Sequence, residues 1–199
     1  MSKERIQGVT EKVYKGVKYR STLEANTAEI LDLLGLPFEY EKKRITLLES
    51  FRCPFQKDKV RAITYTPDFI IGPIMLECKG FETPEWKNKK KYIFKYLMEY
   101  EPATIFYEIK NCGRQLLQAL DNHWTYLGYA IEVTPKPAVK KRRKKGKTID
   151  ESPMLFDSVQ QALHDLHLGG EVTNAILQCM IGKKDYKYGY SWKLKKISL

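Results

Sequence analysis

Three charged residues near the middle of the chain have types and a spacing that suit a divalent metal ion. Asp68 follows Pro67, and Glu77 and Lys79 flank Cys78 in a second apolar segment. Successive side chains of a strand point to opposite faces, so Glu77 and Lys79 share one face while Cys78 faces the core. Two carboxylates and the Cys78 backbone carbonyl provide the hard oxygen ligands that Mg²⁺ prefers, with Mn²⁺ as a substitute.

Such a site indicates chemistry on a phosphate ester. A bound metal ion neutralises charge and activates a water at neutral pH. Lys79 would orient that water or stabilise charge developing on the phosphate. The alternative is a plain ion pair of Glu77 and Lys79 on the solvent face of an edge hairpin. An unpaired buried charge is costly, so charges inside apolar strands need partners or a metal ion.

The hairpin that brings these residues together is predicted from two β-rich segments, residues 63–71 and 74–80. Gly72 and Pro73 between them form a turn signal. A hairpin with this turn places Asp68 beside Glu77. The sequence therefore predicts two carboxylates at one end of a strand pair.

A helix and a strand are predicted before the hairpin. Apolar residues recur at helical spacing in residues 21–34, where Ser21 can cap the start and Gly35 can supply a left-handed C-cap. Residues 38–47 indicate a strand with an irregularity near its middle, and residues 49–61 a polar loop.

Two further helices and strands are expected after the hairpin. Residues 84–99 predict a basic amphipathic helix, 103–109 a buried strand, 114–128 a helix and 129–133 a last strand. The lysines of the first helix either line a path for an anionic partner or form a solvated face. The order of elements predicts an α/β fold with a mixed sheet.

The net charge of +11, with a pI near 9.3, favours an anionic partner such as DNA. Residues 136–147 contain eight lysines and arginines and no acidic residue, so we expect an extended tether. The tether either grips phosphates or serves as a solubilising linker or localisation signal. The residues expected to contact phosphate are Lys140, Lys141, Arg142, Arg143, Lys144 and Lys145.

Other classes of protein are disfavoured by what the sequence contains. The four cysteines include no CxxC pair, and His164 and His167 lack a third ligand nearby, so a structural zinc site is not expected. The N-terminal residues have no apolar targeting segment, and no apolar stretch approaches the length of a membrane span. We therefore expect a cytoplasmic protein with no membrane partner.

The last 47 residues predict a small helical module. Residues 159–166 have apolar side chains on one helical face, Gly169 and Gly170 indicate a turn, and residues 171–182 predict a second helix. This spacing resembles a helix-turn-helix. The expected organisation is a catalytic-size domain at 1–135, a basic linker at 136–152 and the module at 153–199.

The catalytic region also resembles a known family. Pro67-Asp68 followed by Glu77-Cys78-Lys79 is similar to the motif of the PD-(D/E)xK nuclease superfamily. Residues 14–133 more widely resemble the phage endonuclease I family of four-way junction resolvases. The resemblance implies a restriction-endonuclease-like mixed sheet flanked by helices, Mg²⁺ as cofactor, and Glu24 as a further catalytic and metal-binding residue. The alternative for Glu24 is an exposed helix carboxylate.

The C-terminal module resembles the DNA-binding repeat of intron-encoded homing nucleases. The matching residues are Phe156, Ser158, Ala162, Gly189, Tyr190 and Trp192. The resemblance implies that the second helix enters the major groove, with Thr173 and Asn174 as base or phosphate contacts. Alternatively, the module caps the core and Trp192 is a core residue.

The two resemblances together imply a Mg²⁺-dependent DNA endonuclease that cuts at directed sites and is encoded by a phage or mobile element. Its location would then be the cytoplasm of the host cell. The alternatives are a nuclease that resolves four-way junctions and a DNA-binding protein without catalysis. A homodimer is left open.

Overall fold

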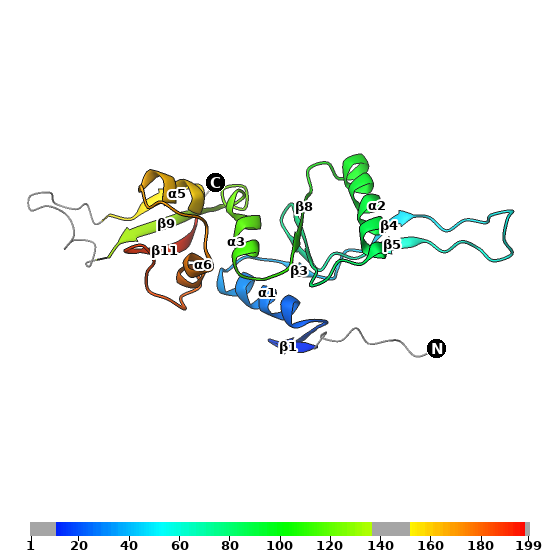
Figure 1. Cartoon of the computed structure of the whole chain (residues 1–199), viewed down its shortest axis with the longest axis horizontal. Helices are drawn as coiled ribbons and strands as arrows, with labels where there is room; N and C mark the ends of the chain where they lie inside the picture. Colours follow the sequence, from blue (N-terminus) through cyan, green and yellow to red (C-terminus); the bar gives the residue numbers. More distant parts are fainter. Residues whose placement is uncertain (1–10, 137–151, 198–199) are drawn as a thin grey trace, which may run out of the picture. The chain divides into compact units, whose positions relative to one another are not determined.

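The computed structural model describes residues 11–136 and 152–197 (Figure 1). The chain divides into two compact units. Unit 1 comprises the residues up to Ala25 together with 36–110, and unit 2 comprises 26–35 together with the residues from 111 onward. Both units contain helices and strands, which confirms the predicted mixed α/β class.

Unit 1 is built on a four-stranded sheet with the strand order β3-β6-β7-β8. The strands are β3 (Glu39–Tyr40), β6 (Phe69–Ile71), β7 (Ile74–Cys78) and β8 (Ile105–Ile109). β6 and β7 form the predicted antiparallel hairpin, and Gly72 adopts the positive φ of 55° that its turn requires. β7 and β8 are parallel and are joined through a helix, so the sheet is mixed.

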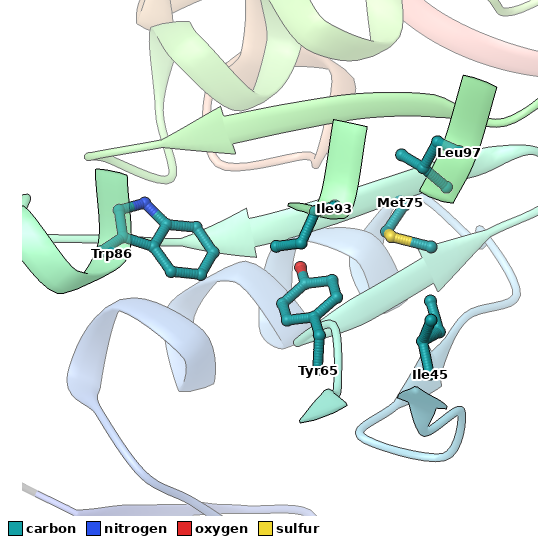
Figure 2. Close-up of a cluster of buried hydrophobic side chains, with 6 residues drawn as sticks. All are labelled: Ile45, Tyr65, Met75, Trp86, Ile93 and Leu97. Atoms are coloured by element: carbon teal, nitrogen blue, oxygen red, sulfur yellow. The ribbon is translucent and has the colours of Figure 1, made fainter. Parts of the chain in front are cut away.

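That helix, α2 (Pro84–Tyr100), covers the strands that carry the candidate site. The Thr83 hydroxyl caps it by accepting a hydrogen bond from the Trp86 backbone N–H, and Pro84 suits the first turn. Its buried face is part of one hydrophobic cluster that Figure 2 shows between α2 and the neighbouring strands. The cluster consists of Ile45, Tyr65, Met75, Trp86, Ile93 and Leu97.

The remaining elements of unit 1 are two hairpins and the start of a helix. The elements are β1 (Lys12–Tyr14), β2 (Val17–Tyr19), α1 (Thr22–Leu33), β4 (Ile45–Leu48) and β5 (Ile63–Tyr65). Gly35 follows α1 with a φ of 71°, as predicted for its C-cap. The expected loop at 49–61 is instead a prolonged hairpin, because Phe51 and Val60 form a further antiparallel bridge beyond β4 and β5.

Unit 2 contains its own antiparallel sheet, with the order β10-β9-β11. Its elements are α3 (Arg114–Asp121), β9 (Tyr129–Pro135), β10 (Met154–Phe156), α5 (Val159–Asp165), α6 (Asn174–Met180) and β11 (Tyr190–Lys196). β9 was predicted to complete the first sheet, but it is the central strand of this one. It pairs with β11 along all seven residues, so the predicted boundary at residue 135 falls inside a sheet.

A buried carboxylate links α3 to α5 within unit 2. Asp121 accepts hydrogen bonds from the backbone N–H groups of Val159 (2.7 Å) and Gln160 (3.0 Å) and from the Trp124 indole. A helix start leaves such N–H groups without intrahelical partners, so Asp121 and the Ser158 cap complete α5. Trp192 is 1% exposed and belongs to the core. None of the helices within the described residues is long and apolar enough to span a membrane.

Candidate active site

One polar pocket of about 480 Å³ in unit 1 is lined by all four of the predicted catalytic residues. They are Glu24, Asp68, Glu77 and Lys79. They come from α1, the start of the β6–β7 hairpin and the end of β7. Sequence positions more than 50 residues apart therefore meet at one place, as the resemblance to the nuclease family implies for Glu24.

Asp68 lies at the position that the hairpin register demands. Phe69 is paired with Leu76, so one further step along the two strands places Asp68 opposite Glu77. The Asp68 Oδ2 accepts a hydrogen bond of 2.7 Å from the Cys78 backbone N–H. Burial and the nearby charge of Glu77 raise the pKa of Asp68 to about 8, and the bond from Cys78 opposes that shift only in part.

Glu77 is buried, with 5% of its surface exposed. It shares a face of β7 with Met75, which packs under α2, and this excludes the alternative of an ion pair on a solvent face. The Tyr65 hydroxyl donates a 2.8 Å hydrogen bond to Glu77 Oε2, and Lys79 Nζ lies 3.6 Å from Oε1. Burial raises the pKa of Glu77, while these two partners oppose the shift.

Tyr65 was not among the predicted site residues. Its ring belongs to the hydrophobic cluster of Figure 2 and lies 6.0 Å from the Trp86 ring, so packing fixes the direction of its hydroxyl. Burial and the neighbouring Glu77 raise the pKa of Tyr65, and the hydroxyl keeps its proton and remains a donor. Tyr65 therefore positions the Glu77 carboxylate.

Glu24 is held in the same way by a second tyrosine. The Tyr40 hydroxyl donates a 2.6 Å hydrogen bond to Glu24 Oε2, and the Tyr40 ring packs 5.3 Å from that of Phe69. Ser21 Oγ donates to Glu24 Oε1 at 2.7 Å and accepts from the Glu24 backbone N–H. With 6% of its surface exposed, Glu24 is no exposed helix carboxylate. The geometry does, however, give it a role in capping α1.

Four cationic side chains line the same pocket as these carboxylates, namely Arg20, Arg44, Lys79 and Lys89. Lys79 Nζ lies 4.5 Å above the Trp86 ring, and Lys89 Nζ lies 5.8 Å from the Tyr65 ring. Burial lowers the pKa of Lys89. A pocket that carries both carboxylates and cations suits a ligand made of a metal ion and a phosphate group.

Sequence reasoning also missed an acidic residue on β8. The parallel register places Glu108 beside Glu77, and Glu108 accepts hydrogen bonds from Lys90 (2.7 Å) and the Trp86 indole. The alternation of side chains along β8 places Glu108 on the same face as Phe106, but only the pairing of β7 with β8 identifies Glu77 as its neighbour.

The donor set suits a hard divalent cation. Asp68 and Glu77 contribute carboxylate oxygens to one pocket, and Cys78 lines it as well. The raised pKa values of the two acids reflect repulsion and burial that a cation would relieve. Within residues 11–136 and 152–197, no three His, Cys, Asp or Glu side chains are close enough to form a metal-binding group. The cation would therefore be bound by few protein ligands.

The residues of the C-terminal half that were predicted to contact DNA differ in whether the structure describes them and in whether their side chains are exposed. Residues 140–145 of the basic run lie outside the described residues. Thr173 immediately precedes α6, but its hydroxyl is buried and has no hydrogen-bond partner, so it is turned away from any base. Asn174 is exposed and remains a candidate contact. His164 pairs with Asp165 rather than with a metal ligand set.

Comparisons of the chain with protein-family models, curated proteins and solved structures found no match. A functional assignment therefore rests on the residues and geometry of this pocket.

The raised pKa of Asp68 predicts how stability depends on pH in the absence of metal ions. The ordinary pKa is 3.8 and the folded value is about 8, so the folded state favours the protonated acid. The stabilisation of the fold by protonated Asp68 is fully present below pH 4 and is lost as the pH rises through about 8. Asp68→Asn mimics the protonated acid and still accepts from Cys78. The free energy of unfolding is measured with urea in EDTA for both chains. Between pH 4 and pH 9, we expect the value for the variant to rise relative to that for the unmodified chain by more than about 1 kcal/mol.

Asp58→Asn is the matched control, because Asp58 is exposed in the loop that follows β4. It makes the same chemical change as Asp68→Asn at a position outside the pocket. A stability difference between Asp68→Asn and the unmodified chain that stays constant from pH 4 to pH 9 would contradict the raised pKa of Asp68.

Proposed function

We propose that the protein is a Mg²⁺-dependent DNA endonuclease that hydrolyses phosphodiester bonds, with a PD-(D/E)xK type of fold and site. The observation that carries the proposal is the convergence of Asp68, Glu77 and Lys79 in a pocket of unit 1 that also contains Glu24. The mixed sheet, with its hairpin and its parallel strand pair, agrees with the fold that the motif implies.

The four predicted catalytic residues and Cys78 each have a role in this proposal. Asp68, Glu77 and the Cys78 carbonyl would hold Mg²⁺, and Glu24 would hold a second ion or a water. Mg²⁺, when bound, would supply charge neutralisation and lower the pKa of a water. Lys79 would orient the attacking water or stabilise developing negative charge, and the Trp86 ring beneath it restricts its ammonium group.

Charge supports DNA as the substrate. Three cations other than Lys79 surround the carboxylates, and phosphates of a DNA strand are anionic at every nucleotide. A protein that only binds DNA gains nothing from buried carboxylates beside the phosphates, because like charges repel. The carboxylate pair therefore favours catalysis over simple binding.

Loss of either metal-binding carboxylate should abolish cleavage. We expect Asp68→Asn and Glu77→Gln each to lower the cleavage rate of plasmid DNA by a factor of about 10³ or more, because each removes metal-bound charge. Binding measured by fluorescence anisotropy in Ca²⁺ should persist. EDTA should stop cleavage by the unmodified chain, and Mg²⁺ or Mn²⁺ should restore it. Near-normal cutting by either variant would refute the assigned site.

The two roles of Glu24 can be separated with a pair of variants. Glu24→Gln removes the carboxylate charge, and we expect cleavage to fall by at least about 100-fold if that charge holds an ion or water. Ser21→Ala removes the cap of α1 but retains the carboxylate, so it should cost about 0.5–2 kcal/mol of stability and leave most of the cleavage. Equal losses of activity in the two variants would indicate that Glu24 serves only the helix cap.

A second candidate is a nuclease that resolves four-way junctions rather than one that is directed to a base sequence. The burial of α6 side chains favours the junction-resolving candidate. Four of them are in the core, namely Ile176, Leu177, Cys179 and Met180. The Thr173 hydroxyl is buried too, so this short helix offers few side chains to a major groove.

Cleavage of matched substrates distinguishes the two candidates. A four-way junction and linear duplexes of the same arm sequences are incubated at equal salt concentration with Mg²⁺. For the junction-resolving candidate we expect the junction to be cut at least about tenfold faster, because branch shape and not sequence is recognised. Cutting of one linear sequence at a fixed position, with no preference for the branch, would instead support the sequence-directed candidate. Asn174→Ala should then weaken that preference.

A further inference from the structure

The hairpin between β4 and β5 extends beyond the strands that support the site. We call residues 49–62 the hairpin arm; in Figure 1 it is the cyan loop whose tip lies away from the sheet of unit 1. Phe51 and Val60 exchange two backbone hydrogen bonds, of 3.1 and 2.8 Å. Near the tip, the Gln56 backbone N–H donates to the Cys53 carbonyl. The arm is therefore a hydrogen-bonded ribbon with a turn at its end.

The tip of the arm presents a phenylalanine to solvent. Phe55 is 93% exposed, and no large apolar side chain among the described residues is more exposed. Phe51, further down the ribbon, is 45% exposed. Burial of a phenylalanine ring is favourable, so a ring held outward at a turn is suited to burial against a binding partner.

The charges around Phe55 indicate the chemistry of that partner. Four basic residues of the arm, Arg52, Lys57, Lys59 and Arg61, are exposed, against two exposed acidic residues, Glu49 and Asp58. An exposed apolar ring on an arm with an excess of basic residues complements nucleic acid, which presents flat apolar bases between anionic phosphates.

The base of the arm leads directly into the candidate active site. Ala62, Ile63 and Thr64 line a hollow of about 460 Å³ with Lys89 and Tyr92. Thr64 and Lys89 also line the catalytic pocket. Arg44, the residue before β4, donates to the Thr64 hydroxyl and lines the catalytic pocket as well. A strand of DNA that occupies the catalytic pocket would therefore continue along the arm.

We propose that the hairpin arm is a DNA wedge, in which Phe55 inserts at a base step of the duplex while Arg52, Lys57, Lys59 and Arg61 contact the flanking phosphates. Apolar side chains that enter base steps unstack them and kink the duplex. The wedge rests on the proposed function, since it gives the nuclease a preference for DNA that is easily kinked or already unstacked.

The length of the arm limits where the wedge can act. Phe55 precedes Tyr65, which contacts Glu77, by ten residues. An extended strand rises about 3.3 Å per residue, so the two positions are at most roughly 33 Å apart. One turn of duplex DNA spans about 34–36 Å. The unstacked base step should therefore lie within about one turn of the bond that is cut.

Fluorescence of 2-aminopurine tests the wedge, because this base brightens when it is unstacked. A set of duplexes carries 2-aminopurine at successive positions within one turn of a mapped cleavage position, and all are measured in Ca²⁺ to prevent cutting. With the unmodified chain, we expect a severalfold rise at one or two adjacent positions. Phe55→Ala should abolish the rise, and Phe55→Trp should restore it.

Met98→Ala is the matched control, because Met98 is also a highly exposed apolar side chain of unit 1 but lies outside the arm. It should leave the fluorescence rise intact. In a second variant set, the four basic residues of the arm become alanine. The slope of log affinity against log salt should then fall by up to about 3.6, because each phosphate that a basic residue neutralises adds ~0.9 to that slope.

The outcomes separate the wedge from the proposed nuclease activity. An unchanged fluorescence rise in Phe55→Ala, with cleavage by the unmodified chain intact, overturns the wedge alone. A change in oligomeric state for Phe55→Ala, seen by light scattering without any fluorescence change, assigns the arm to self-association and also overturns the wedge. Failure of the unmodified chain to bind or cut any DNA overturns both proposals.

Discussion

The clustering of poorly solvated carboxylates is the constraint on which the site of unit 1 depends. Asp68 lies opposite the buried Glu77 across the hairpin, and the buried Glu24 lines the same pocket. Each acid is held by a donor that cannot move easily: the Cys78 backbone for Asp68, Tyr65 for Glu77 and Tyr40 for Glu24. Since both tyrosine rings are packed in apolar clusters, the hydrophobic core also sets the geometry of the charged site.

This arrangement lowers the stability of the folded chain when no cation is bound. Without a cation, burial and the nearby charge of Glu77 raise the pKa of Asp68 to about 8, so the folded chain favours the protonated acid. Lys79 Nζ, which lies 3.6 Å from Glu77 Oε1, opposes the raised pKa of Glu77, and its ammonium group also lies over the Trp86 ring. A bound cation would stabilise the fold, because the pocket that would hold it forms only in the folded chain.

Local patterns predicted the elements that carry the site, whereas pairings between distant segments were not predictable. Gly72 and Gly35 mark a turn and a helix end through backbone conformations that glycine adopts readily, so the hairpin and α1 were found with little error. The alternation of Glu77, Cys78 and Lys79 likewise gave their faces. In contrast, the alternating residues of β9 fit either sheet, and only the register with β11 decides between them. Tyr65 and Tyr40 were missed because a hydroxyl partner 12 or 16 residues away leaves no periodic signal.

The pairing of β9 also decides how the proposed DNA binding by the C-terminal half can be tested. A chain that ends at Pro135 would retain β9 but lack both of its neighbours, β10 and β11, and with them Trp192 from the core. An isolated central strand exposes its apolar side chains and unpaired backbone groups, which favours aggregation. Weak DNA binding by such a truncated chain would therefore report unfolding of unit 2 rather than the removal of phosphate-binding side chains. Point substitutions at exposed positions such as Asn174 keep the sheet intact, so changes in DNA binding can be attributed to the substituted side chain.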